Sequence, residues 1–207
     1  MLNVCALVSG GGTNLQAVFD ALNAGKITNA QVSVVISNKQ DAYALTRAKE
    51  HGVSTKVLSP KDFENRDKFG DALIELLNQY NIDLIILAGY LVILPEKVIK
   101  TYKNRILNVH PSLIPSHCGM GFYGLHVHES VLCRGNKVTG ATVHFVDEGT
   151  DTGPIVLQKA VEVRDDDTPE TLQKRVMEEA EWIILPKAID LIAHDELVIE
   201  NNIVKHR

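Results

Sequence analysis

Apolar residues in the first half of the chain alternate between continuous runs and runs with helical spacing. The continuous runs, typical of buried strands, occupy residues 4–8, 32–36, 83–88 and 106–109, and a further short strand is predicted at 54–57. Helical spacing is clearest in the stripe formed by Phe69, Ala72, Leu73, Leu76, Leu77 and Tyr80. Because parallel strands need crossover connections, this alternation predicts an α/β fold with a parallel sheet and helices on both faces.

Several helix ends are predicted from residues that favour those positions. Asp41 is the expected N-cap of a helix over 41–51, and Pro95 is expected to begin a short helix. The last helix should begin around Thr168-Pro169, with an acidic first turn, and we expect a kink at Pro186.

The pattern changes after Gly135. Residues 137–147 and 155–163 are predicted strands with only a turn between them, and a last strand is expected over 197–204. No repeat or long linker interrupts the chain. We therefore expect a single domain over 1–207, with an open Rossmann-like, mostly parallel sheet and an antiparallel C-terminal addition.

Charge and composition exclude several classes of protein. The net charge of −5 gives no general attraction to nucleic acid or to anionic membranes. The longest apolar stretch, 84–94, has 11 residues, fewer than the ~20 that span a bilayer. The beginning of the chain lacks the basic segment of a signal peptide, and three cysteines do not pair evenly. We expect a reduced, cytoplasmic protein, and the oligomeric state stays open.

A glycine-rich segment, Ser9–Asn14, follows the first predicted strand and precedes the first helix. Ligands of open parallel sheets bind at the carboxyl ends of strands, and a helix N-terminus offers N–H groups to an anion. The segment is therefore a candidate phosphate loop, with a simple tight turn as the alternative. It is a poor dinucleotide fingerprint, because Leu15 stands where the third glycine is wanted.

A second candidate site combines Asn108 and His110, which lie two apart at the end of a predicted strand and so share one face. A turn-forming segment, 147–154, contains Asp151 and is by composition an ordinary surface turn. A functional role for Asp151 requires its carboxylate to reach His110, and the sequence leaves that open.

Two other groups of polar residues have simpler interpretations. His117, Cys118, His126 and His128 are scattered over a glycine-rich loop in no recognised zinc spacing, so no metal is expected. Glu178 and Glu181 lie on the predicted last helix opposite its apolar side, where such pairs are usually solvated.

Six segments together resemble the folate-dependent phosphoribosylglycinamide formyltransferase family over nearly the whole chain. They are SGGGTNLQ, LAGY, NVHPSLIP, GLHVHE, TVHFV and DTGPIVLQ, in this order. The resemblance implies transfer of a formyl group from 10-formyltetrahydrofolate, the co-substrate, to the amine of glycinamide ribonucleotide. It implies no metal, no nucleic acid and no membrane partner.

The resemblance also assigns residues. The catalytic trio falls on Asn108, His110 and Asp151, with Asn108 and a protonated His110 stabilising the oxyanion and Asp151 moving the proton. The carboxylate of Asp151 should favour that protonated His110. The nucleotide-binding positions are the phosphate loop Gly11, Gly12, Thr13 and Asn14, the ribose-binding Glu181, and Glu178. The folate-binding positions, many of them acting through the main chain, are Arg66, Leu87, Tyr90, Leu91, Val92, Ile93, Leu94, Val146, Asp147, Glu148, Gly149 and Thr150.

Three departures from the family pattern affect these assignments. Val92 stands where the family commonly has arginine, and the loop between Pro115 and Gly124 is longer than usual. The last helix is one residue longer between Arg175 and Glu181, which weakens the assignment of Glu178.

Other functions stay open. A formyltransferase acting on methionyl-tRNA or on a nucleotide-linked amino sugar would share the trio, as would a formyltetrahydrofolate hydrolase. The first normally adds a C-terminal domain and the last an N-terminal one, and we expect neither here. A non-catalytic nucleotide sensor would use the glycine loop alone.

Overall fold

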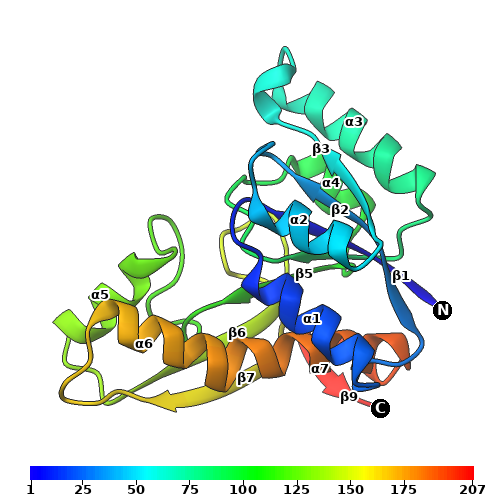
Figure 1. Cartoon of the computed structure of the whole chain (residues 1–207). Coiled ribbons are helices and arrows are strands. Elements are labelled where there is room, and N and C mark those ends of the chain that lie inside the picture. Colours follow the sequence, from blue (N-terminus) through cyan, green and yellow to red (C-terminus); the bar gives the residue numbers. More distant parts are fainter. The chain divides into compact units, whose positions relative to one another are not determined.

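The computed structural model describes all residues, Met1–Arg207 (Figure 1). Contacts divide the chain into two compact units, Met1–Leu107 and Asn108–Arg207. The boundary falls inside strand β5, Ile106–His110, which belongs in part to each unit. The expectation of one domain over 1–207 stays a prediction.

Strands and helices alternate in the first unit, as the apolar pattern predicts. The strands are β1 (Leu2–Val8), β2 (Ala30–Ser37), β3 (Ser54–Val57) and β4 (Leu84–Leu87). The helices are α1 (Thr13–Asn23), α2 (Tyr43–Glu50), α3 (Arg66–Gln79) and α4 (Glu96–Thr101), with a 3-10 turn at Pro60–Asp62. β1 pairs in parallel with β2 and with β4, and β2 pairs in parallel with β3. β1, β2 and β4 are largely buried and read as apolar runs, which explains why they were predictable, whereas β3 is mostly exposed.

The prediction that Asp41 is the N-cap of α2 is wrong. Ala42 occupies that position and no side chain caps the helix. Instead, the backbone N–H of Ala44 in the first turn donates to the carbonyl of Gly10 at 3.0 Å, so a loop carbonyl takes the place of a capping carboxylate. Pro95 is the N-cap residue of α4, immediately before the first helical position.

The second unit combines an antiparallel strand pair with helices. Its elements after β5 are α5 (Leu125–Cys133), β6 (Val138–Phe145), β7 (Ile155–Glu162), α6 (Pro169–Val176), α7 (Trp182–Ala193), β8 (Leu197–Glu200) and β9 (Ile203–His206). β6 and β7 pair antiparallel, as predicted, with an irregularity between Val143 and His144. The placement of His126 and His128 on a glycine-rich loop is wrong, because both lie on α5. Val127 and Val131, both fully buried and four residues apart, anchor this helix.

A seven-stranded sheet runs in the order β3-β2-β1-β4-β5-β6-β7, and β8 and β9 form a separate pair. The predicted α/β fold, with a mixed, mostly parallel sheet and an antiparallel C-terminal addition, is confirmed. No helix in the chain has the length and apolar character needed to cross a bilayer.

The single strand predicted over 197–204 is wrong, because a turn at Asn201 and Asn202 divides it into the β8–β9 hairpin. Both asparagines have positive φ, 50° and 64°, which suits a two-residue hairpin turn.

The last helix is also interrupted. Residues Met177–Glu181 form a π-helical segment between α6 and α7, and Pro186 lies inside α7. A π turn holds one more residue than an α turn because its hydrogen bonds run from residue i to i+5. The segment therefore accommodates the extra residue expected between Arg175 and Glu181.

Candidate active site

The glycine-rich loop in the first unit connects the end of β1 to the start of α1, with Gly12 as N-cap. Gly12 has φ +73°, and a Cβ added there would lie 2.6 Å from the Cβ of Ala44, so only glycine fits. No side chain caps α1. The loop therefore places the N-terminus of a helix directly after a parallel strand, an arrangement that can accept an anion.

Arg47 on α2 holds this loop from outside. Its Nε donates to the carbonyl of Gly11 at 2.9 Å, and its Nη1 donates to Oε1 of Gln16 at 3.0 Å. The guanidinium also lies over the ring of Tyr43, 5.0 Å from its centre. These contacts fix a loop carbonyl and add positive charge beside the candidate phosphate site.

The predicted folate segment, Leu87–Leu94, is held by two side chains of the first unit. Oγ of Ser9 accepts from the N–H of Leu91 at 2.9 Å. Nη2 of Arg66 lies 3.2 Å from the carbonyl oxygens of both Ile93 and Leu94. The side chains of Leu91 and Ile93 are more than half exposed, so they offer apolar surface for a planar ligand.

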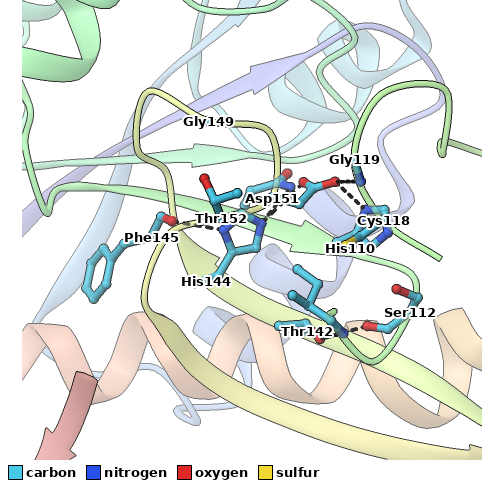
Figure 2. Close-up of polar contacts among 12 residues, drawn as sticks. His110, Ser112, Cys118, Gly119, Thr142, His144, Phe145, Gly149, Asp151 and Thr152 are labelled. Carbon is cyan, nitrogen blue, oxygen red and sulfur yellow. Dashed lines mark hydrogen bonds and ion pairs between the residues drawn. The ribbon is translucent and has the colours of Figure 1, made fainter. Parts of the chain in front are cut away.

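In the second unit, the predicted trio comes together with a fourth residue, His144 on β6. Figure 2 shows Asp151 between His110 and His144. Oδ2 of Asp151 lies 3.6 Å from Nδ1 of His110, and Oδ1 lies 3.6 Å from Nε2 of His144. The amide nitrogen of Asn108 lies 3.2 Å from the same Nε2. Asp151 therefore reaches His110, which the sequence left open.

Asp151 reaches this position because the turn before it folds back on itself. Asp147 accepts from the hydroxyl of Thr152 at 2.6 Å and from the N–H of Gly149 at 3.1 Å. A Cβ on Gly153 would lie 1.9 Å from the carbonyl oxygen of Phe145, so this close return requires glycine. Asp151 has φ +59°, and its side chain is only 11% exposed. The turn lies at the surface, whereas the carboxylate of Asp151 points inward.

Backbone groups of the long loop complete the cluster. Nε2 of His110 lies 2.9 Å from the carbonyl oxygen of His117, which only accepts, so this nitrogen carries the hydrogen. The N–H of Gly119 donates to Oδ2 of Asp151 at 2.9 Å (Figure 2). Both catalytic candidates are therefore tied to the loop between Pro115 and Gly124.

The electrostatics of the cluster differ from expectation at His110. Burial lowers the pKa of His110 below its ordinary value, and His144 lowers it further, although the His117 carbonyl and the Asp151 carboxylate pull it upward. The expectation that Asp151 favours a protonated His110 has the right direction, but desolvation outweighs it. Burial also pulls the pKa of Asp151 upward, but the ring of His144, the N–H of Gly119 and the charge of His110 outweigh that effect. Its pKa lies below the usual value, so the carboxylate is ionised at neutral pH.

Comparisons with known proteins identify the family to which this chain belongs. The family model described as "Formyl transferase" matches residues 2–189. The chain is 38% identical over 203 residues to the phosphoribosylglycinamide formyltransferase of Haemophilus influenzae, covering 98% of this chain and 92% of that protein. The chain belongs to the phosphoribosylglycinamide formyltransferase family.

Other relatives agree with this family. The crystal structure of glycinamide ribonucleotide transformylase 1 from Symbiobacterium toebii superimposes with a TM-score of 0.93 at 44% identity, covering all of this chain and 94% of that chain. The chain is also 41% identical over 199 residues, or 96% of its length, to the bovine trifunctional purine biosynthetic protein adenosine-3. It spans only 19% of the length of that relative.

The two acidic residues that the family resemblance assigns to the nucleotide differ in environment. Glu181 is 6% exposed within the π-helical segment, so its expected position on the solvated side is wrong. The carboxylate of Glu178 is 47% exposed and lies 3.8 Å from Nζ of Lys174, one turn earlier. The widened turn at 177–181 gives the two carboxylates these different environments.

Sequence reasoning missed His144 as a functional candidate, although TVHFV carries the family resemblance. A histidine in a buried strand is usually structural, and the useful signal was its place directly before the turn that carries Asp151. His128 on α5 is another buried histidine, fully excluded from solvent, and burial together with the charge of His110 lowers its pKa to about 4. The structure contains no group of three or more His, Cys, Asp or Glu side chains arranged to hold a metal.

Proposed function

We propose that this chain transfers the formyl group of 10-formyltetrahydrofolate to the amine of glycinamide ribonucleotide, a step of purine biosynthesis. One observation carries the proposal: an ionised Asp151 lies 3.6 Å from two histidines, one of which contacts Asn108, in a chain of this family. Bacterial relatives named phosphoribosylglycinamide formyltransferase support the same acceptor.

The proposed chemistry is direct transfer. The amine nitrogen attacks the formyl carbon, and the carbonyl oxygen gains negative charge in the tetrahedral intermediate. Asn108 and a protonated His110 are the donors that we assign to this charge. Because the hydrogen on Nε2 of His110 is taken by the His117 carbonyl, His110 donates through a protonated Nδ1. The fixed positions of both donors reduce the reorganisation needed as the charge develops.

Proton transfer is the role we assign to Asp151. The attacking amine loses one proton as the new C–N bond forms, and the folate nitrogen gains one as the old C–N bond breaks. An ionised carboxylate that accepts from the N–H of Gly119 and lies 3.6 Å from two histidine rings can accept the first proton, directly or through water, and return it to the leaving nitrogen. Because the two substrates react directly once they are held together, no covalent enzyme intermediate is required.

The remaining assignments concern binding. Residues Gly11 to Asn14 would hold the phosphate, as the helix N-terminus there supports, and Glu181, with Glu178, would hold the ribose. The segments 87–94 and 146–150, together with Arg66, would hold the folate through main-chain groups and exposed apolar side chains. We further propose a cytoplasmic enzyme without a nucleic-acid or membrane partner.

The test is a reaction of the purified chain with 10-formyltetrahydrofolate and glycinamide ribonucleotide, followed by the absorbance of the deformylated folate. Formation of this product only when the ribonucleotide is present supports the proposal. Product formation without an acceptor would indicate a hydrolase, and formation only with charged initiator tRNA would indicate the tRNA formyltransferase. Nucleotide binding with no folate binding would indicate the sensor.

A further inference from the structure

The loop from Ser116 to Gly124 contacts both catalytic candidates through its backbone. The carbonyl of His117 accepts from His110, and the N–H of Gly119 donates to Asp151. The carbonyl of Ser116 accepts from the hydroxyl of Ser112 at 2.5 Å, which fixes the start of the loop to the end of β5. The exact position of this loop therefore decides how the catalytic groups are oriented.

The side chain of His117 is the anchor between this loop and α5. Its Nδ1 lies 2.9 Å from Oγ of Ser130, and its Nε2 lies 3.2 Å from the amide nitrogen of Asn136. An amide nitrogen only donates, so Nε2 accepts and the hydrogen resides on Nδ1, which donates to the serine. The ring also makes an edge contact with Phe122, with ring centres 6.2 Å apart.

The backbone conformation of His117 lets its carbonyl contact His110 while its ring contacts Ser130 and Asn136. Its φ is +49°, in the left-handed region that few residues other than glycine and asparagine adopt. Such a conformation is strained and persists only where surrounding contacts hold it. Here the ring contacts to Ser130 and Asn136 hold it, while the carbonyl points to His110.

We propose that His117 is a positioning residue for catalysis: its ring, bound to Ser130 and Asn136, fixes its own carbonyl as the acceptor that orients His110. The inference rests on the proposed function. With Nε2–H committed to the His117 carbonyl, Nδ1 of His110 faces Oδ2 of Asp151. Without the anchor, the imidazole loses this single orientation, and misplacement by about 1 Å can cost up to about a hundredfold in rate.

The test compares His117→Ala and Ser130→Ala with the wild type, and with His126→Ala as the matched control. His126 lies on α5, its side chain is 59% exposed, and it pairs with Glu129. Its ring meets Tyr123 of the same loop, with ring centres 5.3 Å apart, so His126→Ala removes a histidine contact between α5 and the loop while the contacts of His117 stay in place. We expect His117→Ala to lower kcat about tenfold, with the KM values of both substrates within about twofold. Ser130→Ala should lower kcat less. The double variant should match His117→Ala, since both changes break the same anchor.

A readout independent of turnover is the titration of His110 followed by NMR. His110 faces Asp151, His144 and His128, and the hydrogen bond to the His117 carbonyl favours its protonated form. Loss of the anchor should therefore move the His110 titration to lower pH in both variants, and His126→Ala should leave it unchanged. Asparagine tolerates positive φ and can reach Ser130, so His117→Asn should restore part of the rate.

An unchanged kcat and an unchanged His110 titration in His117→Ala would overturn the inference. The inference would also be overturned if the fold-loss in kcat of the double variant equalled the product of the two single losses, because the two residues would then act separately. If His117→Ala does not fold, the titration in Ser130→Ala decides. A wild type without formyl transfer refutes the proposed function, whereas the NMR result still decides whether His117 positions His110.

Discussion

The side-chain amide nitrogen of Asn108 lies 3.2 Å from Nε2 of His144, although 36 positions separate the two residues. Nδ1 of His144 lies 2.9 Å from the backbone carbonyl oxygen of Phe145, so Nδ1 carries a hydrogen and the ring is fixed (Figure 2). Nε2 then accepts from Asn108. The ring of His144 therefore sets the direction of the Asn108 amide, which we assign to the oxyanion.

Replacement of His144 should damage catalysis without preventing binding. In His144→Ala, Asn108 loses its orienting acceptor and Asp151 loses one of its two histidine neighbours. We expect kcat to fall about 10- to 100-fold, because a misdirected donor stabilises the oxyanion less. Steady-state kinetics should show KM for the ribonucleotide within about threefold of wild type. His206→Ala, a change at an exposed residue of β9, serves as the control. A wild-type kcat in His144→Ala would show that His144 does not orient Asn108.

Replacement of Asp151 or His110 should have a larger effect. Asp151→Asn removes the carboxylate but keeps the size of the side chain, and asparagine tolerates the positive φ at this position. We expect Asp151→Asn and His110→Ala to fold normally and to lose at least ~100-fold in kcat. Circular dichroism and thermal unfolding check the fold. A purified variant with the wild-type rate would remove that residue from the mechanism.

Arg47 should matter for the nucleotide and not for the folate. Its guanidinium fixes the carbonyl of Gly11 and adds positive charge beside the loop. Arg47→Ala should raise KM for the ribonucleotide about tenfold, since charged hydrogen bonds contribute roughly 1.5–3 kcal/mol. Arg47→Lys keeps the charge and should recover part of this loss, and Lys49→Ala on the exposed face of α2 should have no effect. Substitutions of Thr13 and Asn14 should act in the same direction. A change in folate affinity alone would refute the phosphate assignment.

The fold was predictable where one physical pattern dominates. Strands buried on both faces give continuous apolar runs, as in β1 and β4, and the stripe from Phe69 to Leu77 gave α3. The hairpin after Leu197 was missed because apolar residues flank its turn on both sides, which made two short strands look like one. The π-helical turn at 177–181 leaves no mark in an apolar pattern, since it changes hydrogen bonding and not composition.

The site was predictable in part for a similar reason. Asn108 and His110 share a face because strand side chains alternate, and this needs no tertiary information. The contact of Asp151 with His110 depends on how the 147–153 turn folds back, which is a tertiary property. The hydrogen bond that His110 donates to residue 117 goes to a backbone carbonyl. Because every residue type has a backbone carbonyl, the sequence gives no sign of this contact.

Arg66 provides a test of the folate assignment, because it holds the segment in which Val92 replaces the usual arginine. Its guanidinium contacts the carbonyl oxygens of Ile93 and Leu94. Arg66→Ala should loosen this segment and raise KM for 10-formyltetrahydrofolate about fivefold, with KM for the ribonucleotide unchanged. Lys68→Ala, an exposed change in the same turn of α3, is the matched control. A selective effect on the ribonucleotide would contradict the assignment.

An ion pair near the start of α6 should make stability depend on pH. Nη1 and Nη2 of Arg175 donate to the two carboxylate oxygens of Asp167 at 2.6 and 2.5 Å, and the Asp167 side chain is only 1% exposed. The hydrogen bonds from Arg175 hold the pKa of Asp167 at about 2 against its burial. In the unfolded chain the pKa is about 3.9.

A carboxylate whose pKa is lower in the folded state stabilises the protein above its unfolded pKa, and this contribution disappears as pH falls through the folded pKa. Asp167→Asn should therefore lower the free energy of unfolding by about 2 kcal/mol at pH 7, and the difference from wild type should shrink between about pH 4 and pH 2. Urea unfolding at pH 7, 4 and 2 measures this. Asp165→Asn is the control, because that carboxylate is 94% exposed and its pair with Lys137 should contribute little. If Asp167→Asn lowered the free energy of unfolding equally at pH 2 and pH 7, the shape of the side chain, and not its charge, would stabilise this end of the helix.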